Sequence, residues 1–286
     1  MPRGEMQFGV HIFPTETSFQ PDEFARAAEE RGLDSVWFSE HTHIPVRFLT
    51  APGRGPSLPD YYWQTYDLFV AMALAAAATR EIKIASGVAL VIERDPIILA
   101  KETATLDRLS KGRFIFGIGA GWLESEMADH GVVYRTRFQR LKEQIRSIKE
   151  IWTTDESEFH GKFVSFEKMK AFPKPYQRPH PPIIMGGEGE KALACAAELC
   201  DGWAPWLMEW QKAKETIAEL KRQTAANGRD PSLLEISLFE KSIPDRATIS
   251  EMESAGVKRM ILTIFGQSRE EALPALDQIA KIICEK

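Results

Sequence analysis

Short apolar runs and helix-like stretches alternate along almost the whole chain of 286 residues, and this alternation restricts the fold most strongly. The apolar runs are mostly continuous series of Val, Ile, Leu and Phe, which is typical of strands buried on both faces of a sheet. They are centred near residues 8, 37, 86, 115, 184, 204, 237 and 261. Eight strands that are each followed by helical sequence predict an α/β fold of the (β/α)8, or TIM, barrel type. No shift in composition marks a boundary, so residues 1–286 are predicted to form one domain.

Two connections are longer than a barrel needs. Residues 42–63 are polar and rich in Pro and Gly, whereas residues 123–180 contain a helix predicted over about 136–152 and a small hairpin in the sequence FHGKFVSFE. Connections of this length in a compact domain are commonly functional. Because barrel enzymes build their active sites from the loops that follow the strands, we expect both segments to lie at the carboxyl-terminal face.

Charge and cysteine usage exclude several classes of function. The net charge is −5 with a pI near 5.8, and charges of both signs are interspersed, which disfavours nucleic acids and anionic membranes as partners. The N-terminal residues lack the apolar core of a signal peptide, and the most apolar stretch, Leu68 to Ala78, is too short to span a bilayer. The three cysteines form no CxxC pair, and Cys195 and Cys200 are expected to be buried apolar residues. We therefore predict a cytoplasmic protein that acts on a small molecule.

The sequence GRFIFGIGAGW, residues 112–122, places three glycines at the end of a predicted strand. It is not the dinucleotide fingerprint G-x-G-x-x-G, because Trp122 stands where the third glycine belongs, and the chain contains no Walker sequence. In a barrel, Gly119 and Gly121 would lie on the carboxyl-terminal rim. Small residues there expose backbone N–H groups and allow a flat ligand ring to lie against the chain.

A second set of glycines, Gly186, Gly187 and Gly189, follows the fifth predicted strand and precedes a helix that contains Lys191. The backbone N–H groups and the dipole at a helix start form an anion site. Each glycine set alone is equally compatible with a tight turn. Two such rims on one barrel favour a phosphorylated planar cofactor.

Two histidines follow the second predicted strand in the sequence Ser39-Glu40-His41-Thr42-His43. A histidine at the carboxyl end of a barrel strand is typical of a catalytic proton donor or acceptor, which we expect His41 to be. His41 and His43 would alternatively form an HxH metal pair, but the later strands offer no further ligands, so we predict no metal. The remaining alternative is a rim histidine whose hydrogen bonds are satisfied locally.

Carboxylates and tryptophans leave two more alternatives open. Glu40 and Glu240 both end predicted strands, so glycoside hydrolysis by paired carboxylates is conceivable, although it would leave the glycine rims unexplained. Four tryptophans either line a pocket or pack in the core: Trp37, Trp122, Trp203 and Trp206.

The stretch SGVALVIERDPIILAKETATLDRLSKGRFIFGIGAGW, residues 86–122, resembles the signature of the bacterial luciferase-like monooxygenase superfamily. More narrowly, it resembles the coenzyme F420-dependent oxidoreductases of that superfamily. The sequences DSVWFSEHTHIP, FHGKFVSFEKMKAFPKPYQRPHPPIIMGG and EKALACAAELCDGW match the same pattern. The resemblance covers most of the chain to about residue 206, and the C-terminal third is less distinctive.

The resemblance implies a barrel, commonly dimeric, that binds a flavin or deazaflavin at its carboxyl-terminal face. Glu40 and His41 would then lie near the reactive ring. A non-proline cis peptide bond is implied in a bulge of the third strand, around Gly87, Val88 and Ala89, where it would support the ring.

The resemblance also assigns the two glycine rims. Gly119, Ala120, Gly121 and Trp122 would border the cofactor, and Gly186 and Gly187 would contact its phosphate. Similar sugar-phosphate dehydrogenases carry a catalytic acid at the position that Trp122 occupies in this chain. This departure argues against glucose 6-phosphate as the substrate and indicates a more apolar pocket.

These observations together predict an F420-dependent oxidoreductase that transfers a hydride between the deazaflavin and a small organic substrate. His41 would donate or accept the accompanying proton, and Glu40 would orient His41 or bind the cofactor. One alternative is a two-component monooxygenase that uses reduced FMN. Another is a non-catalytic protein that binds a flavin or deazaflavin.

Overall fold

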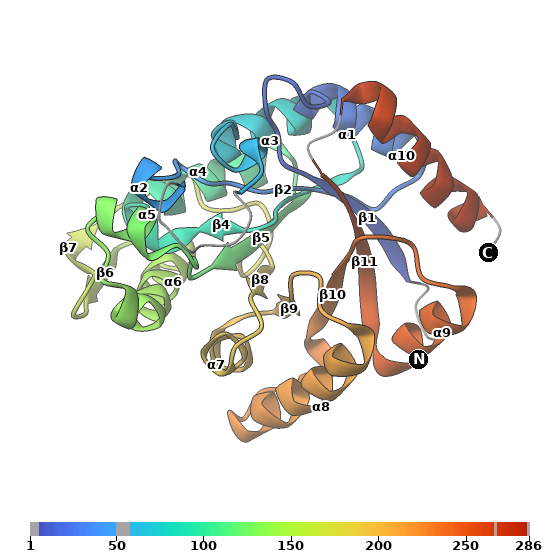
Figure 1. Ribbon diagram of the computed structural model, residues 1–286. Helices are drawn as coiled ribbons and strands as arrows, with labels where there is room; N and C mark the ends of the chain where they lie inside the picture. The colour runs from blue at the N-terminus through green and yellow to red at the C-terminus, as the bar shows by residue number, and fades with distance from the viewer. Residues whose placement is uncertain (1–5, 50–57, 266–267, 285–286) are drawn as a thin grey trace.

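The computed structural model describes residues 6–49, 58–265 and 268–284 (Figure 1). Eight parallel strands are neighbours in the order β3, β2, β1, β11, β10, β9, β8 and β5, and the pairing of β3 with β5 closes them into a barrel. The strands are β1 (Gln7–Ile12), β2 (Ser35–Phe38), β3 (Lys83–Ser86), β5 (Phe114–Gly119), β8 (Ile183–Gly186), β9 (Gly202–Ala204), β10 (Glu235–Glu240) and β11 (Val257–Ile264). The predicted (β/α)8 barrel is confirmed, and each of the eight apolar runs contains one of these strands.

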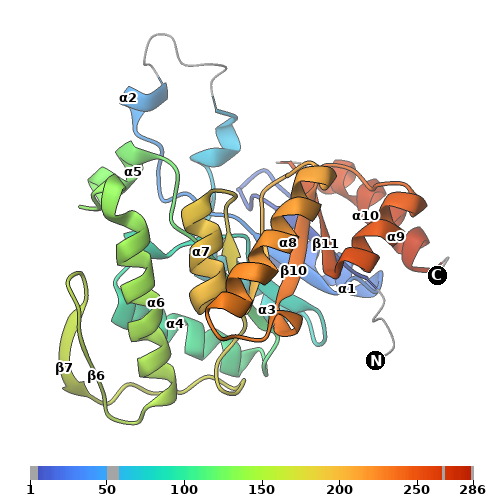
Figure 2. The same ribbon diagram turned by 90° about the horizontal axis from the view of Figure 1, so that it is seen from below.

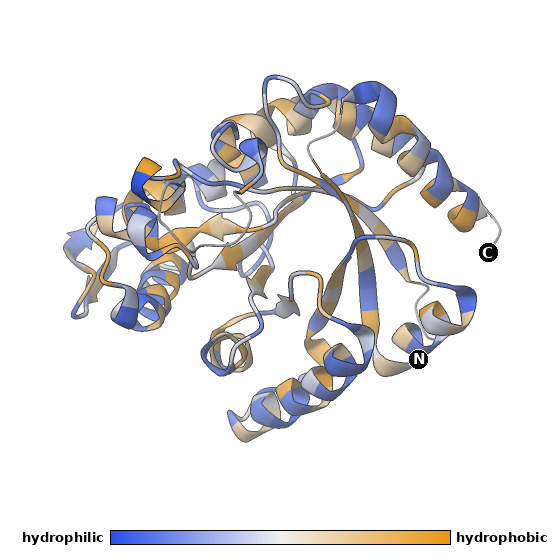
Figure 3. Cartoon of the chain, in the orientation of Figure 1, coloured by the Kyte–Doolittle hydropathy of each residue, from blue (hydrophilic) through white to orange (hydrophobic). Residues whose placement is uncertain are grey.

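The helices cover the outside of the barrel (Figures 1 and 3). They are α1 (Pro21–Glu30), α3 (Leu68–Ala78), α4 (Pro96–Leu109), α6 (Arg137–Thr153), α7 (Glu190–Leu199), α8 (Trp210–Ala226), α9 (Arg246–Ala255) and α10 (Arg269–Cys284). Local sequence sets several of their starts: the Asp67 carboxylate accepts hydrogen bonds from Phe69 N and Val70 N, both at 3.0 Å, and Asp95 caps α4 in the same way. Within the described ranges, no helix is long and apolar enough to cross a membrane.

The side chains that fill the barrel interior differ between its two ends. Midway, apolar residues from several strands pack together: Trp37, Ala85, Ile115, Ile184, Ala204, Phe239 and Ile261. At the amino-terminal end the fully buried guanidinium of Arg259 pairs with Asp34 at 2.6 Å and with Glu235. Burial alone would raise the pKa of Asp34, but the adjacent Arg259 and Lys83 outweigh it and lower that pKa. This end of the barrel is therefore closed by a buried ion-pair network.

The two long connections reach different parts of the molecule (Figure 2). The helix α2 (Val46–Leu49) from the first and α5 (Glu124–Asp129) from the second lie together at the carboxyl-terminal face, as predicted. The predicted helix corresponds to α6, which packs between α4 and α7 as a regular outer helix of the barrel, so the prediction that all of residues 123–180 lie at the carboxyl-terminal face is wrong for this part. The predicted hairpin, β6 (Ser157–His160) with β7 (Ser165–Met169), packs along α6, where Glu143 accepts a hydrogen bond from Phe163 N at 2.7 Å. Residues 50–57 of the first connection lie outside the described residues.

Candidate functional site

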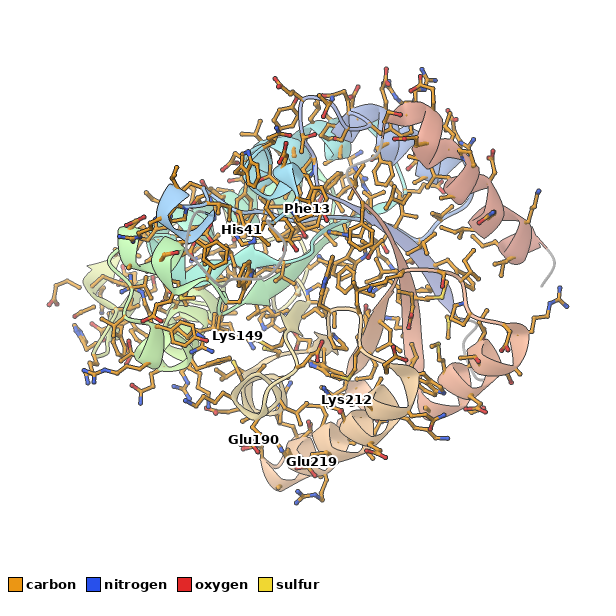
Figure 4. The ribbon with its side chains drawn as sticks, viewed as in Figure 1. Phe13, His41, Lys149, Glu190, Lys212 and Glu219 are labelled. Carbon is orange, nitrogen blue, oxygen red and sulfur yellow. The ribbon has the colours of Figure 1, made fainter. Side chains whose placement is uncertain are left out.

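A cavity of about 760 Å³ lies at the carboxyl ends of the strands. Figure 4 labels Phe13 and His41, which follow β1 and β2 on the wall of this cavity. The structure brings almost all predicted site residues to its lining: Glu40, His41, Gly87, Val88, Gly119, Ala120, Gly121, Trp122, Gly186 and Gly187. Ala89 is the exception, because it belongs to the short strand β4 (Ala89–Leu90), pairs with Ile118 of β5 and packs into the barrel wall.

The third strand is interrupted by a bulge at the cavity wall, and the peptide bond between Gly87 and Val88 is cis, in the segment where the resemblance implied such a bond. The hydroxyl group of Ser39 donates a hydrogen bond to the carbonyl oxygen of Gly87 at 2.6 Å. Because that hydroxyl has one hydrogen, its contact with His11 Nε2 at 2.7 Å makes the imidazole the donor. Burial lowers the pKa of His11 to about 3, so the ring is neutral at pH 7. His11 thus supports the bulge, a role that the sequence did not indicate.

The two glycine rims flank Val88 from opposite sides. A Cβ atom added to Gly119 would lie 2.8 Å from Val88 Cγ2, and one added to Gly186 would lie 3.0 Å from Val88 Cγ1. Both distances are shorter than a normal contact between carbon atoms, so side chains at these positions would displace Val88. The absence of Cβ atoms on Gly119 and Gly186 therefore makes room for the Val88 side chain, which lines the cavity between β5 and β8.

Beyond the second rim, the first turn of α7 contributes to the same cavity. Gly189 is the N-cap residue and supplies no capping side chain, while Glu188, Glu190 and Lys191 also line the cavity. The first N–H groups of a helix have no partner inside the helix, and the helix dipole favours negative charge there. This turn is therefore suited to bind a phosphate group.

His41 is held by a carboxylate that sequence reasoning did not identify. Its Nδ1 atom lies 2.7 Å from Oε2 of Glu126, which comes from α5, and both side chains are buried. The imidazole ring packs against Tyr62 and Trp122, with ring centroids 5.3 and 5.7 Å apart. With Nδ1 engaged, Nε2 is the nitrogen of His41 that remains to act in the cavity.

Glu40 has different partners from those that we expected. Its carboxylate accepts a hydrogen bond from Leu90 N at 2.7 Å and pairs with the guanidinium of Arg94. Glu40 therefore anchors the end of β4 and the segment that follows it, while the expected contact with His41 is made by Glu126. The carboxylate of Glu40 reaches Leu90 because β2 and β3 are neighbours in the barrel.

A third buried carboxyl group, that of Glu93, lies behind the first glycine rim. Burial, together with the nearby carboxylates of Glu126 and Glu40, raises the pKa of Glu93 to about 8, although Arg94 acts in the opposite direction. Its Oε2 atom has no hydrogen-bond partner among the described residues and lies 3.8 Å from Nε2 of His130. Glu93 is therefore predominantly protonated at pH 7.

Aromatic side chains form the rest of the wall near His41, including Phe13, Tyr62, Trp122 and Trp206. Burial raises the pKa of Tyr62, so its phenol stays neutral at pH 7. Of the four tryptophans, Trp37 and Trp203 are fully buried in the core instead.

The other sequence candidates are not assembled into a site. Glu240, whose pKa is raised to about 7 by burial and by Glu209, is not among the residues that line the cavity with Glu40. His43 contacts Thr42 and Asp129 rather than pairing with His41, and no group of three possible metal ligands occurs in the described part of the chain. Cys195 and Cys200 are buried and free, as predicted for apolar core residues.

Comparison with known proteins agrees with this geometry. The family model for luciferase-like monooxygenases matches residues 17–271. The chain belongs to this family. Among solved structures, monooxygenase RslO1 from Streptomyces bottropensis covers 96% of the chain and 98% of its own, with a TM-score of 0.78 and 20% identity. An F420-dependent secondary alcohol dehydrogenase covers 97% of the chain and 98% of its own, with a TM-score of 0.76 and 19% identity. Both support the barrel fold.

Relatives in the luciferase-like family use two different cofactors. An uncharacterized protein of Mycobacterium tuberculosis is 36% identical over 284 residues, 98% of this chain and 99% of its own. An FMNH2-dependent dimethylsulfone monooxygenase of Pseudomonas putida is 33% identical over 155 residues, 53% of this chain and 42% of its own. An F420-dependent glucose-6-phosphate dehydrogenase of Amycolatopsis mediterranei is 35% identical over 185 residues, 63% of this chain and 51% of its own. The chain is thus an enzyme of a family with F420-dependent and FMNH2-dependent members.

Proposed function

We propose that the protein is an F420-dependent oxidoreductase that transfers a hydride between the deazaflavin and a small, uncharged organic substrate. The observation that carries the proposal is the convergence of His41, the bulge at Gly87–Val88 and the two glycine rims on one cavity. The volume of about 760 Å³ lies within the range of cofactor and ligand sites. Val88, which the two glycine rims accommodate, would support a flat ring from the bulge, and the first turn of α7 fits a phosphate group.

When bound, the deazaflavin would supply or accept the hydride at C5. The chain would supply binding, orientation and a proton. The rim at Gly119 would border the ring, while Gly186, Gly187 and the first turn of α7 would bind the phosphate. His41 gives a proton to the substrate oxygen during reduction or takes it during oxidation, through Nε2.

The lining of the cavity supports an apolar substrate. Trp122 contacts His41 at the position where similar sugar-phosphate dehydrogenases carry an acid, and Phe13 and Trp206 extend this aromatic surface. The cationic residues that line the cavity, Arg137 and Lys191, begin α6 and α7, where a cofactor phosphate would lie. We therefore expect aldehydes, ketones or alcohols without a phosphate group as substrates.

Parallel titrations of the purified protein with F420 and with FMN, followed by fluorescence, test the cofactor assignment. We expect saturable binding of F420 at lower concentration than of FMN. Tighter FMN binding would overturn the assignment. It would favour the second candidate, a monooxygenase that uses reduced FMN, which the similarity to the FMNH2-dependent monooxygenase of Pseudomonas putida supports.

A panel of enones, aldehydes and alcohols, with and without a phosphate group, then tests turnover by the loaded protein. Oxidation or reduction of F420 is followed by absorbance. Tight F420 binding without turnover of any compound would instead identify a non-catalytic deazaflavin-binding protein.

We further propose that the protein is a cytoplasmic homodimer. Its acidic charge favours a small-molecule substrate over nucleic acid or an anionic membrane surface. The outward side of α3 exposes Val70 and Leu74, at 68% and 48%, and Ile98 of α4 is exposed at 60%. Light scattering should give twice the chain mass, and Leu74→Glu should shift the protein to monomers. A monomer mass at every concentration would contradict the dimer.

A further inference from the structure

The carboxylate of Glu126 is fixed through both of its oxygen atoms. Oε2 contacts His41 Nδ1 at 2.7 Å, while Oε1 accepts hydrogen bonds from Thr42 N at 3.0 Å and from Thr42 Oγ1 at 3.4 Å. The exposed fraction of the Glu126 side chain is 1%, and that of His41 is 6%. His41 and Thr42 follow β2, whereas Glu126 lies 85 residues away from His41 in α5. The contact is therefore made by the tertiary fold.

We propose that Glu126 is the positioning residue for His41: it keeps the proton of the neutral imidazole on Nδ1, directs Nε2 to the cavity and balances the charge of the imidazolium. The part that concerns proton transfer rests on the proposed function. The part that concerns the tautomer rests on the contact alone. A carboxylate has no proton to donate, so a hydrogen bond with Nδ1 requires the hydrogen to be on the imidazole.

The proton balance of the reaction shows why this arrangement matters. During oxidation of an alcohol, the substrate carbon loses a hydride to the deazaflavin, and the hydroxyl group loses its proton to Nε2 of His41. The O–H bond breaks, the Nε2–H bond forms, and the ring becomes an imidazolium. Its positive charge then lies beside the buried Glu126 carboxylate, which stabilises it. The reverse reaction returns the same proton to the carbonyl oxygen.

Neither of the other buried carboxyl groups near the cavity is placed for this role. Glu40 is paired with Arg94, and Glu93 has its own proton and no hydrogen bond with His41. The other groups around His41 are neutral: Tyr62 and Trp122 pack on its ring, and the Thr65 hydroxyl binds its backbone. His130 and His43 contact Thr42 rather than His41. Glu126 therefore provides the negative charge that contacts the imidazole.

The first test needs neither cofactor nor substrate. Nitrogen-15 NMR of the histidine rings, titrated to the alkaline end where the ring is neutral, reports which nitrogen holds the hydrogen. The resonances of His41 are assigned by their loss in His41→Gln. We expect the Nδ1–H tautomer in the wild-type protein. In Glu126→Gln the amide oxygen would remain on Thr42 N, its NH2 group would face Nδ1, and the ring should change to Nε2–H. The same tautomer in both proteins would overturn the proposal.

The second test is kinetic and uses the F420-loaded enzyme. Glu126→Gln should lower kcat by at least about 100-fold, because losing a carboxylate that orients a functional histidine costs from about 10-fold to about 10⁴-fold. KM and F420 binding should stay within about twofold of the wild-type values. The acid limb of the pH profile for oxidation should move to lower pH, because the imidazolium loses its negative neighbour. Glu126→Asp keeps the charge and should restore the position of that limb.

The matched control is Glu124→Gln, which changes an exposed carboxylate on the same helix and should leave kcat and the pH profile unchanged. Wild-type kcat with an unchanged profile in Glu126→Gln would overturn the catalytic part of the proposal. If Glu126→Gln does not fold, Glu126→Asp serves as the test variant. A His41 tautomer, or a position of the acid limb of the pH profile, that differs from that of the wild type would contradict the proposal. If instead the proposed function is wrong, the wild-type protein will turn over no substrate, whereas the NMR result on the His41 tautomer will be unaffected.

Discussion

The protonated carboxyl group of Glu93 provides a quantitative test of the electrostatics behind the cavity. The ordinary pKa of 4.5 applies in the unfolded chain, whereas burial and the neighbouring Glu126 and Glu40 raise the pKa to about 8 in the folded protein. Below pH 4.5 both states are protonated and there is no cost. As pH rises from 4.5 to 8, only the unfolded chain loses the proton, so the free energy of unfolding falls.

Each pH unit between the two pKa values lowers the free energy of unfolding by about 1.4 kcal/mol. At pH 7 the cost is about 3 kcal/mol, and it approaches about 5 kcal/mol above pH 8. Glu93→Gln puts a neutral amide of nearly the same shape in this position and removes the cost. We therefore expect the variant to be more stable than the wild type at pH 7, with a gain that disappears near pH 5.

Thermal unfolding measured every half pH unit from 5.0 to 8.5 is the assay. A gain of about 3 kcal/mol corresponds to an increase in Tm of about 6 °C or more in a protein of this size. The difference in Tm between Glu93→Gln and wild type should grow steadily with pH and level off above pH 8. The exposed Glu124→Gln serves as control and should follow the wild type throughout. A difference that is constant across this range would refute a raised pKa of Glu93.

Three further outcomes test other parts of the structure. His41→Gln should lose turnover by at least about 100-fold while F420 binding is retained, and full turnover in steady-state assays would exclude His41 as the proton donor or acceptor. Gly119→Ala would bring a Cβ atom to 2.8 Å from Val88 and displace that side chain from the cavity wall, so we expect at least tenfold weaker F420 binding by fluorescence titration. Unchanged binding would exclude a role of this rim in holding the cofactor. Arg259→Met would remove the fully buried cation that Asp34 and Glu235 share and leave them with only the more exposed Lys83 and Lys258, so it should lower the free energy of unfolding by about 3–5 kcal/mol in urea titrations. Lys258→Met, at an exposed cation paired with the same Glu235, should have a much smaller effect.

The strands and the cavity wall were largely predictable because they depend on local sequence. Continuous apolar runs identified the eight strands, and glycines at strand ends identified the rims. The packing position of Ala89 was not predictable, because it depends on how the chain resumes pairing with β5 after the bulge at Gly87. The prediction that residues 1–286 form one domain stays a prediction.

Glu126 illustrates what local sequence does not reveal. It lies in a short acidic stretch in which several carboxylates look alike, and its partner His41 is 85 residues away. One signal was available: Leu123, Glu126 and Met127 have the spacing of one helix face, and both apolar neighbours are buried. A carboxylate on the apolar face of a helix requires a partner in the fold. Sequence alone does not identify that partner.

The three carboxyl groups around the cavity show how the environment separates residues of one type. Glu40 is neutralised by the guanidinium of Arg94, Glu93 is neutralised by its own proton, and Glu126 is left with His41, whose charge changes during proton transfer. At pH 7 the charge of Glu40 is balanced by Arg94 and most of Glu93 is protonated, so neither group offers its negative charge to His41. Glu126 contacts the imidazole of His41, which lines the cavity. In the proposed reaction, the His41–Glu126 pair is therefore the part of the site that would respond to the transfer of a proton.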